Sequence, residues 1–222
     1  MNMRLQNSSG WLCGLLAIIG LTAVACGMWL RPTSPQPVNE RSGADVIAMA
    51  YKYHNGGGYS LKATGVPENV IFKRAKILTA GKGTNCSGFT FAVAMHVAAD
   101  RSLTLDFQPA QIRRFQQEWF GVPPNSQVKT LVQAMQDSGI GHEVSPLDAR
   151  PGDFVQFWAE KQGHSVIFLD WIKRDGQIIG LKYRSSQPAT NGIGDFSALF
   201  TTSGSSKGVI LPGKFFVGRL NG

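Results

Sequence analysis

The sequence has few cysteines and few charged residues. Two of its three cysteines, Cys13 and Cys26, lie within the first 30 residues, so Cys86 is the only thiol in the remaining chain and has no disulfide partner there. Charged residues make up 16% of the 222 residues, whereas glycine occurs 26 times. This composition argues against a helical bundle or a disordered chain and favours a loop-rich α/β or α+β domain.

Patterns for nucleic-acid or zinc binding are also missing. The chain has no zinc-finger spacing, no RNP-like aromatic motif and no repeated basic helix. Four scattered histidines lack the close ligand pairs of zinc sites. The formal net charge is +8, and residues 31–222 retain +7 because Arg4 is the only charged residue before Arg31. We expect a basic surface near an anionic cell envelope, with no nucleic-acid partner, no metal and no cofactor.

Residues 1–30 predict a signal peptide or a membrane anchor. Residues 11–30 read WLCGLLAIIGLTAVACGMWL, an uncharged run of about 20 residues that is long enough to span a bilayer. Three outcomes stay open: an uncut anchor, a lipoprotein with lipid on Cys26, and a leader cleaved after residues 23–25. Each exports residues 31–222 to the periplasm or cell envelope, or out of the cell.

The remaining chain predicts a linker at residues 31–43 and one domain, without internal repeats, at residues 44–222. With 43% hydrophobic residues the chain can bury a core. Helical spacing comes first and strand patterns follow residue 151, an order typical of an α+β fold. The expected helices cover residues 44–53, 70–78, 86–99, 108–119 and 126–138, and the expected strands cover residues 154–158, 164–172, 177–187 and 214–220.

Cys86 is a candidate nucleophile. Asn85 is a good N-cap, so the thiol falls in the first turn of a helix, where unpaired N–H groups and the helix dipole favour a thiolate. Ser87 and Gly88 are small enough to let a substrate approach. The alternative is a cysteine that packs as a small hydrophobic side chain.

A nucleophilic cysteine needs a base, and His164 is the best placed of the histidines. His96 lies on the same expected helix as Cys86, about 15 Å away by helical rise, and cannot reach the thiol. His54 lies in a glycine-rich loop and His142 in a loop before the sheet. His164 opens an expected strand, where its alternative role is a solvent-facing histidine at the strand edge.

The Asp-Gly pair at residues 175–176 predicts a two-residue hairpin turn. With a constant register, His164 then lies opposite Gln187, and Ile172 lies opposite Ile179. A single bulge would shift this pairing.

Gln187 is therefore expected to accept a hydrogen bond from one imidazole nitrogen of His164 and to direct the other nitrogen to the thiol. Ser185 lies on the same strand face and is the reserve candidate for this role. Ser186 points to the opposite face.

Three segments resemble motifs of the NlpC/P60 cysteine peptidases. Residues 85–89 (NCSGF) resemble the family's D-C-S-G-F/L signature, with Asn85 in place of the usual Asp. Residues 149–155 (ARPGDFV) resemble the PGDLV strand, and residues 163–168 (GHSVIF) resemble the GHVGIYL strand, in the family's order. The glycine run at 56–58 and the tyrosines before it resemble the segment upstream of the nucleophile. The resemblance covers about residues 44–220.

This resemblance implies a papain-like α+β fold in which the nucleophile helix packs on a small antiparallel sheet. It also implies hydrolysis of peptide or amide bonds in peptidoglycan stems by Cys86, His164 and a third residue (His, Asn or Gln in the family), here Gln187. The expected substrate-binding or oxyanion-stabilising residues are Tyr51, Tyr53, Tyr59, Ser87 and Ser185.

Other functions remain open on the same residues. A thiol acyltransferase would share the chemistry as far as the acyl-enzyme. A non-catalytic envelope-binding module would keep the fold without a reactive thiol, and a secreted antibacterial amidase would differ only in its target cell.

Overall fold

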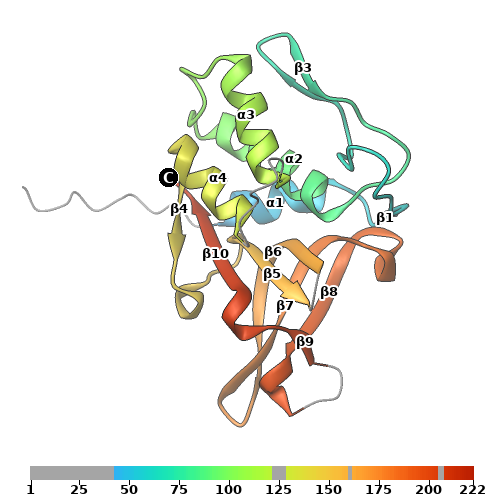
Figure 1. The fold of residues 1–222 in the computed structure, drawn as a ribbon, viewed down its shortest axis with the longest axis vertical. Coiled ribbons are helices and arrows are strands. Elements are labelled where there is room, and N and C mark those ends of the chain that lie inside the picture. The colour runs from blue at the N-terminus through green and yellow to red at the C-terminus, as the bar shows by residue number, and fades with distance from the viewer. Residues whose placement is uncertain (1–42, 122–128, 160–161, 205–207) are drawn as a thin grey trace, which may run out of the picture. The chain divides into compact units, whose positions relative to one another are not determined.

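A computed structural model describes residues 43–121, 129–159, 162–204 and 208–222 (Figure 1). The leader, anchor and linker expected within residues 1–42 lie outside this range. The described chain is an α+β domain, as predicted, and most strands of its mostly antiparallel sheet follow the helices, while three short strands lie between the first and second helices. No helix in these ranges has the length and apolar character needed to cross a membrane.

The helices follow the predicted apolar periodicity closely. The first helix, the cysteine helix and the next helix confirm the predictions for 44–53, 86–99 and 108–119 within one residue. Of the helix expected at 126–138, residues 126–128 lie outside the described chain. The helices are α1 (Ala44–Lys52), α2 (Cys86–Asp100), α3 (Pro109–Trp119) and α4 (Thr130–Ser138), with 3-10 turns at Pro146–Asp148, Pro188–Thr190, Thr201–Ser203 and Pro212–Lys214.

The main sheet has the strand order β1-β8-β7-β6-β5-β10-β4, and β9 pairs with β8 in parallel. A separate pair, β2 and β3, lies outside this sheet. All four predicted strands are present. The strands are β1 (Gly56–Gly57), β2 (Val70–Phe72), β3 (Ala75–Leu78), β4 (Gly141–Val144), β5 (Phe154–Ala159), β6 (Gln162–Arg174), β7 (Gln177–Gln187), β8 (Gly192–Phe200), β9 (Gly208–Ile210) and β10 (Phe215–Leu220).

The helix expected at residues 70–78 is wrong, because this segment forms the β2–β3 hairpin. Lys73 and Arg74 make its turn with φ values of 45° and 68°. Such left-handed turn positions usually carry Gly or Asn, so two basic residues gave no turn signal. The β-branched and aromatic residues of β2 favour a strand once this turn forms.

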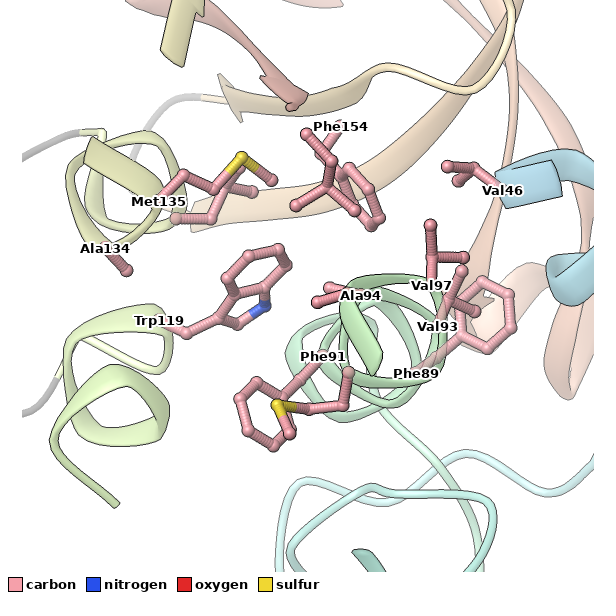
Figure 2. Close-up of a cluster of buried hydrophobic side chains, with 14 of the residues drawn as sticks. Val46, Phe89, Phe91, Val93, Ala94, Val97, Trp119, Ala134, Met135 and Phe154 are labelled. Atoms are coloured by element: carbon pink, nitrogen blue, oxygen red, sulfur yellow. The ribbon is translucent and has the colours of Figure 1, made fainter. Parts of the chain in front are cut away.

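Helix α2 lies in the centre of the core and is apolar on nearly all sides, with Phe89, Phe91, Val93 and Val97 almost fully buried (Figure 2). It packs against β6 and β7 on one side and against α1 and α3 on others. Trp119 of α3 lies beside it, with ring centroids 6.1 Å from Phe91. A helix buried in this way has little freedom to move, so its first residue, Cys86, has a fixed position.

The segment before β5 is held by a buried ion pair. Asp153 accepts hydrogen bonds from Arg219 of β10 at 2.8 and 2.9 Å, and its side chain also accepts from the Arg150 N–H at 2.7 Å. Gly152 has φ +94°, and a Cβ there would overlap the Gly43 backbone. The Pro-Gly-Asp sequence therefore anchors the start of β5 and places this strand beside β6.

Candidate active site

Cys86 is the first residue of α2, and the predicted cap is confirmed. The Oδ1 atom of Asn85 accepts from the Gly88 N–H at 2.9 Å. The N–H groups of Cys86 and Ser87 belong to the first turn and have no intrahelical acceptor. Cys86 as a whole residue is half-buried. This end of α2 thus places the sulfur beside backbone donors.

Asn85 also works as a donor. Its buried side-chain amide lies 3.3 Å from the Ser60 carbonyl and 3.5 Å from the Ala63 carbonyl. An aspartate could cap the helix but could not donate to these two carbonyls. A Cβ at Gly65 would overlap the Asn85 amide, and a Cβ at Gly88 would overlap the Gly65 backbone. The loop before α2 is therefore tightly fitted to asparagine at this position.

The structure brings Cys86, His164 and Gln187 together. The Nε2 atom of His164 lies 3.2 Å from Oε1 of Gln187. The imidazole also lies close enough to the Cys86 thiol to lower its pKa, and because Nε2 faces Gln187 we assign the nitrogen on the sulfur side to Nδ1. Nε2 then carries a proton and donates it to Gln187, which leaves Nδ1 to exchange a proton with sulfur.

Thr190 determines which way the Gln187 amide faces. The Thr190 hydroxyl donates to the Gly192 carbonyl, so it can only accept from Nε2 of Gln187, which lies 3.0 Å away. The amide oxygen must then face His164. Thr190 has no local sequence signal, because its role depends on the 3-10 turn that follows β7.

Two aromatic rings hold the imidazole in place. The centroid of His164 lies 5.4 Å from that of Phe157 on β5 and 5.6 Å from that of Tyr183 on β7, both in edge-on geometry. Phe157 is the backbone partner of His164. Neither ring was predicted, although a known register between residues 154–159 and 162–167 would have indicated Phe157.

The β6–β7 pairing has the predicted register at the turn and near the site, but a different register in between. Asp175 and Gly176 form the turn, with φ values of 50° and 78°. Ile172 pairs with Gly180, so the predicted partner Ile179 is wrong. The register is one residue off in the middle of the hairpin and returns at the Phe168–Tyr183 pair.

Two irregularities in the pairing cause the register shift and its reversal. Ile179 is an extra residue on β7, and Leu169 is an extra residue on β6. Their shifts cancel before the strands reach the site, where the predicted contact between His164 and Gln187 is present. Ser186 follows Ser185 on β7 and so lies on the opposite face of the strand, as predicted. Its hydroxyl lies 2.8 Å from that of Thr84, just before α2.

The surroundings of Cys86 lower the pKa of its thiol to about 7. Burial alone would raise this pKa. The hydrogen bond and the charge of His164 outweigh that effect, and the Ser165 N–H and the Ser87 hydroxyl contribute further. The Ser165 donor was not predicted, because it is a backbone group. A large fraction of the thiol is therefore ionised at neutral pH.

Ser87 and Tyr59 lie near the thiol, and Ser185 contacts a neighbouring strand. Ser87 Oγ is 3.9 Å from the sulfur. Burial is the main cause that raises the pKa of Tyr59, and the negative charge of Cys86 raises it further. This phenol therefore lies within electrostatic reach of the thiol. Ser185 is fully buried, and its hydroxyl donates to the Ser165 carbonyl at 2.7 Å, so it supports the strand beside the thiol and is closed to a substrate.

Tyr51 and Tyr53 have other partners. The Tyr51 hydroxyl donates to Asp195 at 2.6 Å, and its ring lies against the guanidinium of Arg184. The Tyr53 hydroxyl donates to Glu68 at 2.6 Å. The structure thus does not bring these two hydroxyls to Cys86.

Potential metal ligands do not gather in the described ranges, where no group of three or more His, Cys, Asp or Glu side chains could hold an ion. Comparisons of the chain with protein-family models, with curated proteins and with solved structures found no match.

Proposed function

We propose that this chain is an exported cysteine hydrolase of the NlpC/P60 type, with a papain-like arrangement of helix and sheet, that cleaves peptide or amide bonds in peptidoglycan stems. The observation that carries the proposal is the hydrogen bond between His164 and Gln187, together with the lowered thiol pKa that the same imidazole causes in Cys86 at the N-terminus of a buried helix. The sequence of residues 1–30 supports export, with the chain anchored, lipidated on Cys26 or released.

The reaction begins with a thiolate and an imidazolium. The Cys86 sulfur attacks the carbonyl carbon of the scissile bond and forms a carbon–sulfur bond. The backbone N–H of Cys86 donates to the resulting oxyanion. The Tyr59 hydroxyl, which lies within electrostatic reach of the sulfur, is the candidate second donor.

His164 then completes both halves of the reaction. Its Nδ1 proton goes to the leaving amine, the carbon–nitrogen bond breaks and a thioester remains on Cys86. A water molecule gives a proton back to His164 and attacks the thioester. The carbon–sulfur bond breaks, and a carboxylic acid leaves. Gln187 keeps Nε2 protonated throughout, so that Nδ1 is always the nitrogen that exchanges protons.

The test compares the full chain with its Cys86→Ala and His164→Ala variants on purified peptidoglycan, with products identified by mass spectrometry. We expect new fragments from the wild type, and losses of activity on the order of 10³-fold or more in both variants. Fragments that gain water indicate hydrolysis. Fragments joined to a second amine would indicate acyl transfer instead. Full activity of Cys86→Ala would contradict the proposal.

A further inference from the structure

A cleft of about 290 Å³ opens beside the segment that leads into α2. One wall is the end of α1 with the glycine run of β1, and the other is the loop at residues 81–84. Thr84, on this second wall, lies two residues before Cys86. The first wall continues into Tyr59, which forms a backbone bridge with Thr84. The edge of the cleft at Thr84 therefore lies within about two residues of extended chain from the Cys86 backbone.

The lining of the cleft combines a basic rim with an uncharged interior. Lys52 and His54 are exposed on its first wall, and in the described chain no hydrogen bond or ion pair engages either side chain. The rest of the lining contains no carboxylate and consists of Tyr53, Gly56, Gly57, Val66, Pro67, Gly81, Gly83, Thr84 and Ile193. The acidic residues nearest in sequence are already used, since Glu68 binds Tyr53 and His96, and Asp195 binds Tyr51 and Arg184.

The glycine walls are a structural requirement of this cleft. Gly56 and Gly57 have φ values of +84° and +85°, and both pair with β8. Any side chain there would be strained, so no side chain projects from this wall, and Lys52 is the only formally charged residue of the lining.

We propose that this cleft binds a carboxylate-bearing segment of the peptide substrate, with the Lys52 ammonium and the His54 ring N–H as donors to the carboxylate. The inference rests on the proposed hydrolase function, because it assigns the substrate's acidic group a place next to the bond that Cys86 attacks. An ammonium at an open cleft is a charge-assisted donor, which discriminates a carboxylate from the amide of the same shape.

The experiment measures binding without turnover. The full chain carrying Cys86→Ala is titrated with soluble stem-peptide fragments of peptidoglycan, once with free carboxylates and once with the carboxylates converted to amides. We expect the free acid to bind about tenfold more tightly than the amide, the range of one charge-assisted hydrogen bond. Adding Lys52→Gln should bring this ratio close to one, and His54→Asn should lower it.

The matched control is Lys173→Gln, an exposed lysine near the tip of the β6–β7 hairpin with the same change of charge. Equal ratios in the Lys52 and Lys173 variants would overturn the inference, as would equal binding of acid and amide, or no binding of either at millimolar concentration. Cleavage by the wild type is measured in parallel. Discriminating binding without cleavage would contradict the hydrolase proposal alone, and cleavage without discrimination would contradict the cleft alone.

Discussion

The amide nitrogen of Gln187 donates to the hydroxyl of Thr190 at 3.0 Å, and this contact leaves only the amide oxygen to face His164. Without this hydrogen bond the side-chain amide of Gln187 would be free to flip. A reversed amide would present its N–H₂ group to Nε2 and favour the tautomer with the proton on Nδ1. Thr190 is therefore a positioning residue for the base.

Thr190→Val removes the hydroxyl at nearly constant volume. We expect kcat for peptidoglycan fragments to fall by up to about tenfold, the equivalent of one neutral hydrogen bond, with KM unchanged. The alkylation midpoint of Cys86 should also move upward, because the imidazole is less well oriented. Thr190→Ser should restore both values. A loss of thermal stability with unchanged kcat and midpoint would show that Thr190 only supports the fold.

The pKa of Cys86 can be read from the rate of iodoacetamide alkylation as a function of pH. A thiol with a pKa of about 7 reacts faster as the pH rises through that value, because the thiolate is the reactive form. We expect a midpoint near 7 for the wild type. His164→Ala removes the largest lowering contribution, so the midpoint should rise toward the ordinary value of 9.0. A wild-type midpoint near 9 would mean that the imidazole does not contact the thiol in solution.

Asn85→Asp tests why this chain carries asparagine before the nucleophile. The carboxylate keeps the helix cap but faces the carbonyls of Ser60 and Ala63 without a proton to donate. We expect a loss of about 1–3 kcal/mol in the free energy of unfolding, measured in urea. The added negative charge should also raise the pKa of Cys86. Asn85→Ser, which caps without the charge, should leave that pKa nearly unchanged. Unchanged stability of the Asp variant would exclude the donor role of the amide.

The buried pair of Asp153 and Arg219 should stabilise the domain without taking part in the chemistry. Asp153→Ala leaves the guanidinium buried without its carboxylate, and we expect a loss of about 3–5 kcal/mol in the free energy of unfolding. Glu118→Ala breaks the more exposed pair with Arg114 and should have a much smaller effect on stability. Similar losses in both variants would contradict the assigned difference in burial.

The sequence predicts the helices and the central strands because their signals are local. Apolar spacing marks α1 and α3, the apolar run after the Asn85 cap marks α2, and the Asp-Gly pair marks the hairpin turn. The short strands β1 and β4 and the strand β8 were not predicted. Gly56 and Gly57 form a strand only through pairing with Gly192 and Ile193, a contact that no local pattern encodes.

The candidate site shows the same division. Cys86, His164 and Gln187 could be predicted because each has a clear place at a helix start or on a hairpin. The groups around them, such as the Ser165 N–H and the Phe157 ring, act through backbone or packing and have no residue signature. Tyr51 and Tyr53 were expected at the site from their place before the glycine run. Their hydroxyls instead bind acidic partners that are distant in the sequence.

The β6–β7 hairpin carries one extra residue on each strand, Leu169 and Ile179. The alignment of the site therefore depends on the two strands carrying equal numbers of extra residues. Because side chains alternate between faces, a deletion of either residue alone would offset the two strands by one position and replace Gln187 with a neighbour of the wrong face. A matched deletion of both would restore the alignment. The two strands can therefore change length only together, and this coupling links the exposed tip of the hairpin to the geometry around His164.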